Sequence, residues 1–166
     1  MWETIDDDYL AELRELPKYK VAGTRLKPKT SQFLEQQFEL ESETPGIKFR
    51  LYRRHHVSNP AVFSVGLQAH VDDHWLTLCR YNGPYHPHRN HLDKSRLVGV
   101  AHIHTATAAY MREAPHPDGF AEATSRYTDV ESAFSCIIAD CNILGIKPRS
   151  ELDDEDDDPN LTFDFE

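Results

Sequence analysis

Five histidines lie close together near the middle of this chain of 166 residues, which contains ten histidines in all. His86, His88 and His91 belong to the segment RYNGPYHPHRNH, and His102 and His104 belong to GVAHIHTATAAY. Imidazole has the side-chain pKa nearest to neutrality, and it is also the commonest metal ligand in proteins. A cluster of this density indicates a functional site rather than core packing.

The alternation in the second segment predicts how two of these rings are presented. Successive side chains of an extended strand point to opposite faces, so His102 and His104 share one face while Ala101 and Ile103 share the other. We expect Ala101 and Ile103 to be buried and the two imidazoles to lie together in a cleft. At least one histidine of the preceding segment should lie within a side chain's reach of them.

One chemistry that fits these residues is metal-free hydrolysis of a phosphodiester in RNA. One imidazole would accept the 2′-hydroxyl proton, a second would protonate the leaving oxygen, and an arginine would stabilise the charge that develops at phosphorus. Guanidinium groups bind phosphate in bidentate fashion, and tyrosines offer hydroxyls and stacking surfaces. The candidates for catalysis are His86, His88, His102, His104, Arg80 and Tyr110, and those for substrate binding are Arg89, Asn90, Tyr81 and Tyr85.

Two alternatives stay open beside this hypothesis, which itself requires no cofactor. The first is a metal-dependent hydrolase, in which three imidazoles and a water would form a catalytic zinc site. The spacing matches no standard zinc motif, and no glutamate stands at HExxH spacing. The second is a non-catalytic binding module whose acidic tail engages a basic protein partner. The zinc ligands of the first alternative would be His86, His88, His102 and His104.

The acidity of the chain is concentrated at its end. The net charge is -10, but residues 151–166 hold nine acids and no base, which leaves nineteen acids and eighteen bases in residues 1–150. We predict one domain over residues 1–148 and an acidic, disordered tail over residues 149–166. The near-neutral domain lacks the strong positive balance of most nucleic-acid binders. If RNA binds, its backbone is expected to follow Lys48, Arg50, Arg53 and Arg54.

Composition also indicates the cellular location of the protein and the redox state of its cysteines. No apolar run has the length needed to span a bilayer, and the N-terminus is acidic, so we expect a cytoplasmic protein without membrane contact. Cys79, Cys136 and Cys141 are odd in number and form no CxxC pair. They are therefore expected to be reduced, half-buried thiols.

The pattern of apolar residues predicts an α+β fold. Alternation indicates strands near residues 34–40, 47–51, 63–71, 75–81 and 100–104, joined by short turns. We expect these to form an antiparallel meander of four to six strands, with an N-terminal helix and C-terminal helices packed on one face. In the fourth strand, Leu76 and Leu78 should face away from Trp75, Thr77 and Cys79.

Capping signals place the helices. Thr4 is the expected N-cap of a first helix that Pro17 ends, and the basic segment 18–29 is expected to be a loop. Thr128 and Glu131 form a T-x-x-E capping box before the last helix.

Three ordered motifs carry a resemblance to known proteins. RYNGPYHPHRNH, the stretch HIHTATAAY and the later FAEATSRYTDVESAF together resemble a family of small, uncharacterised bacterial proteins, over roughly residues 45–145. This resemblance implies an architecture and no mechanism. The strands that lead into RYNGPYHPH also resemble TumE-type toxins of bacterial toxin-antitoxin pairs, which implies RNA cleavage and a cognate protein partner as expectations.

Overall fold

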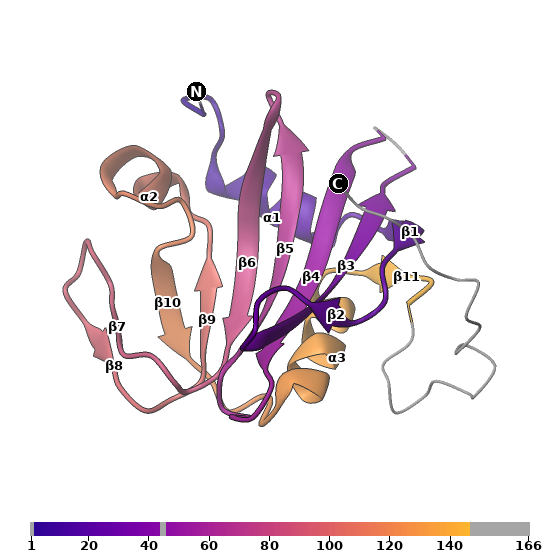
Figure 1. Ribbon diagram of the computed structural model, residues 1–166. Helices are drawn as coiled ribbons and strands as arrows, with labels where there is room; N and C mark the ends of the chain where they lie inside the picture. The colour runs from indigo at the N-terminus through magenta and orange to yellow at the C-terminus, as the bar shows by residue number, and fades with distance from the viewer. Residues whose placement is uncertain (1, 44–45, 147–166) are drawn as a thin grey trace.

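The centre of the molecule is a large twisted sheet (Figure 1). The computed structural model describes residues 2–43 and 46–146, and this part of the chain forms nine strands in the order β10-β9-β6-β5-β4-β3-β1-β11, with β2 paired to β3. Neighbouring strands are antiparallel except β1 and β11, which are parallel. The sheet strands are β1 (Lys18–Gly23), β2 (Lys27–Pro28), β3 (Phe33–Glu41), β4 (Lys48–His56), β5 (Phe63–Val71), β6 (His74–Asn82), β9 (His102–Thr105), β10 (Phe120–Ala123) and β11 (Ile143–Leu144).

The described chain also contains three helices and a small hairpin. The hairpin of β7 (His88–Arg89) and β8 (Arg96–Leu97) lies between β6 and β9 in sequence. The helices are α1 (Asp7–Glu15), α2 (Ala108–Glu113) and α3 (Val130–Asp140). The mixed α/β class is therefore as predicted, and β3 to β6 form an antiparallel meander as expected, with one irregularity in β6. The sheet has more strands than the four to six expected, because segment 18–29 forms β1 and β2 instead of a loop and because β10 and β11 were not predicted.

The two faces of the sheet have different surroundings. Helices α1 and α3 pack against one face, and the core forms there from apolar residues such as Leu51, Leu67, Leu13 and Ile137. Figure 1 is viewed from the other face, and no helix of the described chain lies in front of it. We call the second face of β4, β5, β6 and β9 the uncovered face, and its side chains include Arg50, Tyr52, Arg80, His102 and His104.

One buried lysine joins the two core helices at their C-terminal ends. The Lys18 side chain has no exposed surface, and its ammonium donates to the carbonyl oxygens of Arg14, Leu16 and Cys141 at 2.7–2.8 Å. Burial lowers its pKa to about 8. The last carbonyls of a helix lack intrahelical donors and carry the negative end of its dipole, so a cation there satisfies both needs.

The helix caps differ by one or two residues from those predicted. The N-cap of α1 is Asp6, which accepts from the backbone N–H of Tyr9, and not Thr4. The capping box of α3 pairs Asp129 with Ser132 rather than Thr128 with Glu131. An aspartate in extended backbone caps as well as a threonine does, so neighbouring T and D residues leave the first turn ambiguous in the sequence.

One irregularity in β6 overturns its predicted alternation. The β5–β6 register shifts so that Leu67 pairs with Cys79 while Gln68 pairs with Thr77, which leaves Leu78 as the extra residue of a β-bulge. Leu78 and Cys79 are therefore both buried, although they are adjacent. The prediction that Cys79 lies on the side of Thr77 was wrong for this reason.

The bulge also decides where the next residues of β6 point. Arg80 pairs with Gly66 and His104 and reaches the uncovered face. Tyr81 pairs with Val65 and lies in the core beneath the sheet.

The remaining structural expectations concern the cysteines, the tail and the membrane. Cys79 and Cys141 are buried with their sulfurs 3.7 Å apart, Cys136 is half-buried, and all three are free thiols. The predicted tail over residues 149–166 lies outside the described residues. In the ranges 2–43 and 46–146, every helix is too short or too polar to cross a bilayer.

Candidate functional site: a histidine cluster beneath a hairpin

Three of the five clustered histidines form a compact group. The ring centroids of His88 and His104 are 4.5 Å apart, those of His102 and His104 are 5.1 Å apart, and those of His88 and His102 are 5.8 Å apart. His102 and His104 extend from the same face of β9, as the alternation predicts, while His88 comes from β7. The structure thus brings one histidine of the first motif into contact with both histidines of the second.

The burial of these strand residues is the reverse of the prediction. His102 and His104 are 2% and 3% exposed, whereas Ala101 and Ile103 are only half-buried. The hairpin segment that contains His88 packs over the two rings and removes them from water. The imidazoles therefore lie in a nearly closed site rather than in an open cleft.

Backbone carbonyls fix the proton position on each ring. Nδ1 of His102 lies 3.0 Å from the Val100 carbonyl oxygen, and Nδ1 of His104 lies 2.9 Å from that of Asp118. Nε2 of His88 lies 2.8 Å from the carbonyl oxygen of Gly119. A carbonyl only accepts, so each of these nitrogens donates its hydrogen. In the neutral rings, Nε2 of His102, Nε2 of His104 and Nδ1 of His88 then keep a lone pair.

The surroundings hold the two strand histidines in the neutral form. Burial is the main cause that lowers the pKa of His104 to about 3, with further contributions from the cation Arg80 and the neighbouring His88. Burial likewise lowers the pKa of His102, although its hydrogen bond to the Val100 carbonyl acts in the opposite direction. Desolvation disfavours the charged form of an imidazole, so both rings are bases without a proton at neutral pH.

A cation lies next to the cluster. Arg80 stands opposite His104 in the β6–β9 register, and its Nε is 3.4 Å from a carboxylate oxygen of Asp118. That Nε is buried and makes no hydrogen bond within the described chain. About a third of the Arg80 side chain is exposed, so its guanidinium has donors left for an anion that approaches the uncovered face.

Asn90 attaches the hairpin to the edge of the sheet. Its amide accepts from the Ala121 N–H at 2.8 Å and donates to the Ala121 carbonyl at 2.9 Å, as a neighbouring strand would. Its oxygen also lies 3.1 Å from Nε2 of His88, and its nitrogen donates to Ser95. Asn90 is 2% exposed, so in this structure it positions His88 and is not available to a substrate.

The other predicted site residues lie apart from the three rings. Tyr81 is on the helix-covered side, where its hydroxyl donates to Asp140. Tyr110 is buried, and its hydroxyl oxygen accepts from the Leu92 N–H. The predicted residues Tyr85, His86 and Arg89 are exposed, as is His91 of the same motif, and the rings of Tyr85 and His86 pack at 4.3 Å.

Three contributors to the site were missed in the sequence. Asp118 neutralises Arg80 in part and orients His104, and the Gly119 carbonyl orients His88. The Tyr127 hydroxyl donates to the carbonyl oxygens of Asn82 and His102 and so fixes β9 against β6 from the core side. Backbone carbonyls leave no signal in the sequence, whereas an acid between two motifs, as in HPDGF, was visible.

The donor set does not form a metal centre as it stands. Across residues 2–43 and 46–146, no three His, Cys, Asp or Glu side chains are placed so that they could hold a metal ion together. For zinc, at least one of the three rings would have to turn so that the free nitrogens converge.

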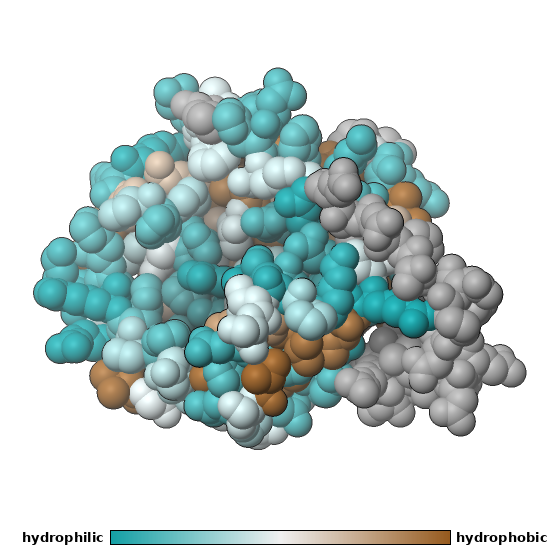
Figure 2. All heavy atoms as spheres, viewed as in Figure 1, coloured by the Kyte–Doolittle hydropathy of each residue, from teal (hydrophilic) through white to brown (hydrophobic). Residues whose placement is uncertain are grey.

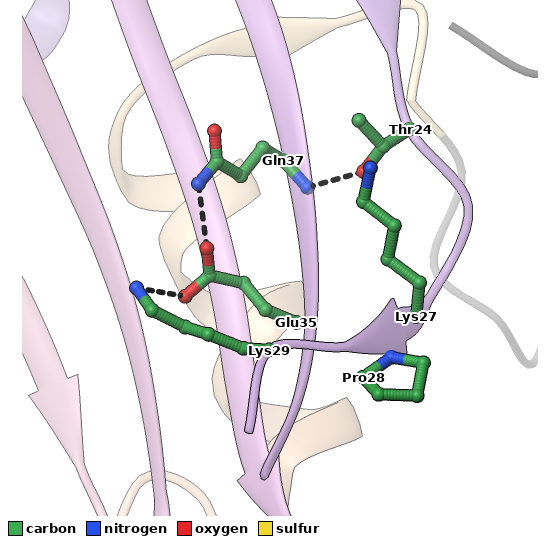
Figure 3. A pocket seen from close by; sticks show the side chains of 6 residues that line it. All are labelled: Thr24, Lys27, Pro28, Lys29, Glu35 and Gln37. Atoms are coloured by element: carbon green, nitrogen blue, oxygen red, sulfur yellow. Dashed lines mark hydrogen bonds and ion pairs between the residues drawn. The ribbon is translucent and has the colours of Figure 1, made fainter. Parts of the chain in front are cut away.

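A separate hollow lies on the same face of the sheet as the histidines, but at β2 and β3, several strands away from them. It has a volume of about 110 Å³ and is lined by residues of β2, β3 and the segments before and after β2 (Figure 3). Glu35 at its centre is bound by Lys29 at 3.1 Å and by Gln37, so the buried charge is already paired. The hollow therefore offers little for a ligand to recognise.

Comparisons with known proteins identify no relative of this chain. The chain matches no protein-family model, no curated protein and no solved structure. The resemblances to a bacterial family and to TumE-type toxins stay predictions.

Proposed function

We propose that the protein is a small hydrolase that cleaves phosphodiesters in RNA, with the cluster of His88, His102 and His104 as its acid–base centre. The observation that carries the proposal is that two buried, neutral imidazoles with fixed tautomers stand beside Arg80 on the uncovered face. A base that lacks its proton and a guanidinium with unused donors are two of the three parts that phosphoryl transfer from a 2′-hydroxyl requires.

The general base is a strand histidine. The lowered pKa values keep His102 and His104 unprotonated at neutral pH, and the carbonyl partners of Nδ1 leave Nε2 as the basic atom. Nε2 would take the 2′-hydroxyl proton while the oxygen attacks phosphorus. Arg80 would bind the non-bridging oxygens and stabilise the charge that builds up on them.

The general acid arises when substrate binds. A phosphate brings a negative charge into the site, and a nearby negative charge raises the pKa of an imidazole. One of the three rings then takes up a proton, which it delivers to the leaving 5′-oxygen. Access runs through His88 and Arg80, because these two side chains are partly exposed while His102 and His104 are not.

The test is cleavage of a labelled single-stranded RNA by the full chain. His104→Gln should lower the rate by about a hundredfold or more, because it removes the base but can still donate to the Asp118 carbonyl. His74→Gln changes an exposed histidine at the start of β6 and should cleave as the wild type does. Wild-type protein that leaves RNA intact, or a His104→Gln variant of full activity, would contradict the proposal.

A zinc-dependent hydrolase is the second candidate, and one observation favours it. Metal-bound histidines usually donate their other N–H to a carbonyl or carboxylate, and all three rings do so here. His88, His102 and His104 would be the ligands after rotation of a ring, with zinc activating a water. Elemental analysis of untagged protein and cleavage in the presence of a chelator separate the candidates, because only the zinc enzyme loses activity to the chelator.

A further inference from the structure

We infer that the uncovered face is a binding surface for single-stranded RNA, which leads the strand into the histidine cluster. This inference rests on the proposed function for the position of the phosphate that is cleaved. It adds the form of the substrate and the residues that hold it. Figure 2, drawn from the same side, shows that hydrophilic side chains cover most of this face over β5, β6 and β9.

Basic side chains extend across the uncovered face. Lys48, Arg50 and Arg54 extend from alternate positions of β4, and Arg80 follows on β6. The residues of β4, β5, β6 and β9 that face this way include no acid, whereas Glu35, Glu39 and Glu41 of β3 face the same way, opposite Arg54, Arg50 and Lys48. The acids therefore lie along the β3 side, and the local attraction to phosphates is strongest from β4 toward β6 and β9.

Arg53 belongs to the other face, which corrects the predicted track. It is 6% exposed, donates to Glu131 at 3.0 Å and lies over the Phe134 ring at 4.8 Å. Alternation along β4 therefore assigns Lys48, Arg50 and Arg54 to the RNA and Arg53 to the core.

A tyrosine lies flat on the sheet in the middle of the face. Tyr52 stands opposite Gly66, and a Cβ added at Gly66 would meet the Tyr52 ring and hydroxyl at 2.5 Å. The ring thus occupies the space that a side chain of β5 would fill. It lies in one cross-strand row with Arg80 and His104, about 14 Å across at the usual strand spacing. A flat aromatic ring beside a cation is a platform on which an unpaired base can stack.

Arginines accompany both aromatic residues of the face. The Arg54 guanidinium lies 5.3 Å from the centroid of Tyr52, and that of Arg50 lies 4.1 Å from the centroid of Trp75. Arg54 Nε is buried without a hydrogen bond in the described chain, although Glu35 is 3.4 Å away. Paired arginine and aromatic groups offer a phosphate contact and a stacking contact together, whereas the bases of a duplex are already stacked on each other.

The experiment measures binding separately from cleavage. The probe is a fluorescent single-stranded 2′-O-methyl RNA, which has no free 2′-hydroxyl, and the readout is fluorescence anisotropy with the full chain. Tyr52→Ala should raise the Kd about tenfold, and Tyr52→Phe should bind as the wild type does. Gly66→Ala should weaken binding as Tyr52→Ala does, because its Cβ displaces the ring. Arg50→Gln and Arg54→Gln should each reduce the slope of log Kd against log salt by about 0.7.

Lys20→Gln is the control of matched charge. Lys20 is exposed on the helix side of the sheet, with its ammonium over Phe38 at 5.7 Å, so its loss should change the Kd by less than about twofold. Face variants that bind like the wild type, Lys20→Gln that binds as weakly as they do, or a duplex bound as tightly as the single strand would each overturn the inference.

The two proposals fail in different ways. RNA bound on this face but not cleaved would sustain the inference and contradict the hydrolase. Cleavage unaffected by changes at Arg50, Tyr52 and Arg54 would sustain the hydrolase and contradict the surface. A single-stranded DNA of the same sequence, bound equally well, would overturn the assignment to RNA.

Discussion

At the scale of single residues, the protein gives buried histidines an unusual acid–base character. A histidine in an unfolded chain has a pKa near 6.5, and burial takes that of His104 to about 3 in the folded protein. Between these two values the unfolded chain binds a proton that the folded chain does not. Stability must therefore fall as the pH is lowered through this window, and it is fully retained only above about pH 6.5.

This behaviour can be measured with one substitution. When the pH is lowered from about 6.5 to about 5, the unfolding free energy of the wild type should fall by about 2 kcal/mol because His104 takes up a proton only in the unfolded chain. His104→Gln has no titrating group at this position and should not show this loss. Urea denaturation of both proteins across this range gives the difference. Parallel pH profiles for the two proteins would show that His104 is not held neutral.

Sequence reasoning found the histidines but not their state. The density of imidazoles and the alternation in HIH located His102 and His104 on one face, because side-chain direction in a strand is a local property. Their burial depends on how the β7–β8 hairpin packs over β9, which no spacing rule contains. Tyr81 and Asn90 were expected to touch substrate, yet Tyr81 faces the core and Asn90 holds the hairpin.

At the scale of secondary-structure elements, two buried polar side chains join separate parts of the fold through hydrogen bonds to backbone groups. Asn90 takes the place of a strand beside β10 through two hydrogen bonds to Ala121. Asn90→Ala would leave both backbone groups without a partner in a buried position, at a cost of about 2–3 kcal/mol. Ser95→Ala removes only one of the four partners of Asn90 and should cost less than half as much. Chemical denaturation measures both, and equal losses would contradict a strand-like role for Asn90.

Lys18 plays the corresponding part for the helices. Lys18→Met keeps the length of the side chain but leaves the carbonyls of Arg14, Leu16 and Cys141 without their donor. Relief from burying a charge offsets part of this loss, so we expect a net destabilisation of about 2 kcal/mol. Lys20→Met, two residues along the same strand, should change stability by less than about 0.5 kcal/mol. If Lys18→Met had a higher thermal or urea midpoint than the wild type, the free energy of desolvating the ammonium would exceed the stabilisation from its three hydrogen bonds.

At the scale of the whole molecule, the meander was predictable and its edges were not. Strands β3 to β5 alternate because one of their faces is buried, and β6 does so on either side of its bulge, whereas β1 carries exposed Tyr19 and Val21 beside buried Lys18 and gives no such pattern. Two-residue strands such as β2 and β11 are defined by their partners and have no period at all.

The last strand of the described chain is β11, in which Ile143 pairs with Lys18 and is 4% exposed. Removal of residues 149–166 takes away nine acids and leaves this pairing untouched. The thermal midpoint of the shortened chain should therefore stay within about 2 °C of that of the full chain. A large drop in a calorimetric scan would mean that the last residues contribute to the folded core.

The bulge at Leu78 determines which residues of β6 face the site. Upstream of it, the even-numbered residues of β6 face the helices; downstream, the odd-numbered ones do. If β6 kept its present length but paired without the bulge, Arg80 and Asn82 would turn toward the core and Tyr81 toward solvent, with every side chain chemically unchanged. The bulge and the length of β6 are therefore linked: a related chain that lacks the bulge should be one residue shorter between Leu76 and Arg80, because only then do the residues that follow keep their faces.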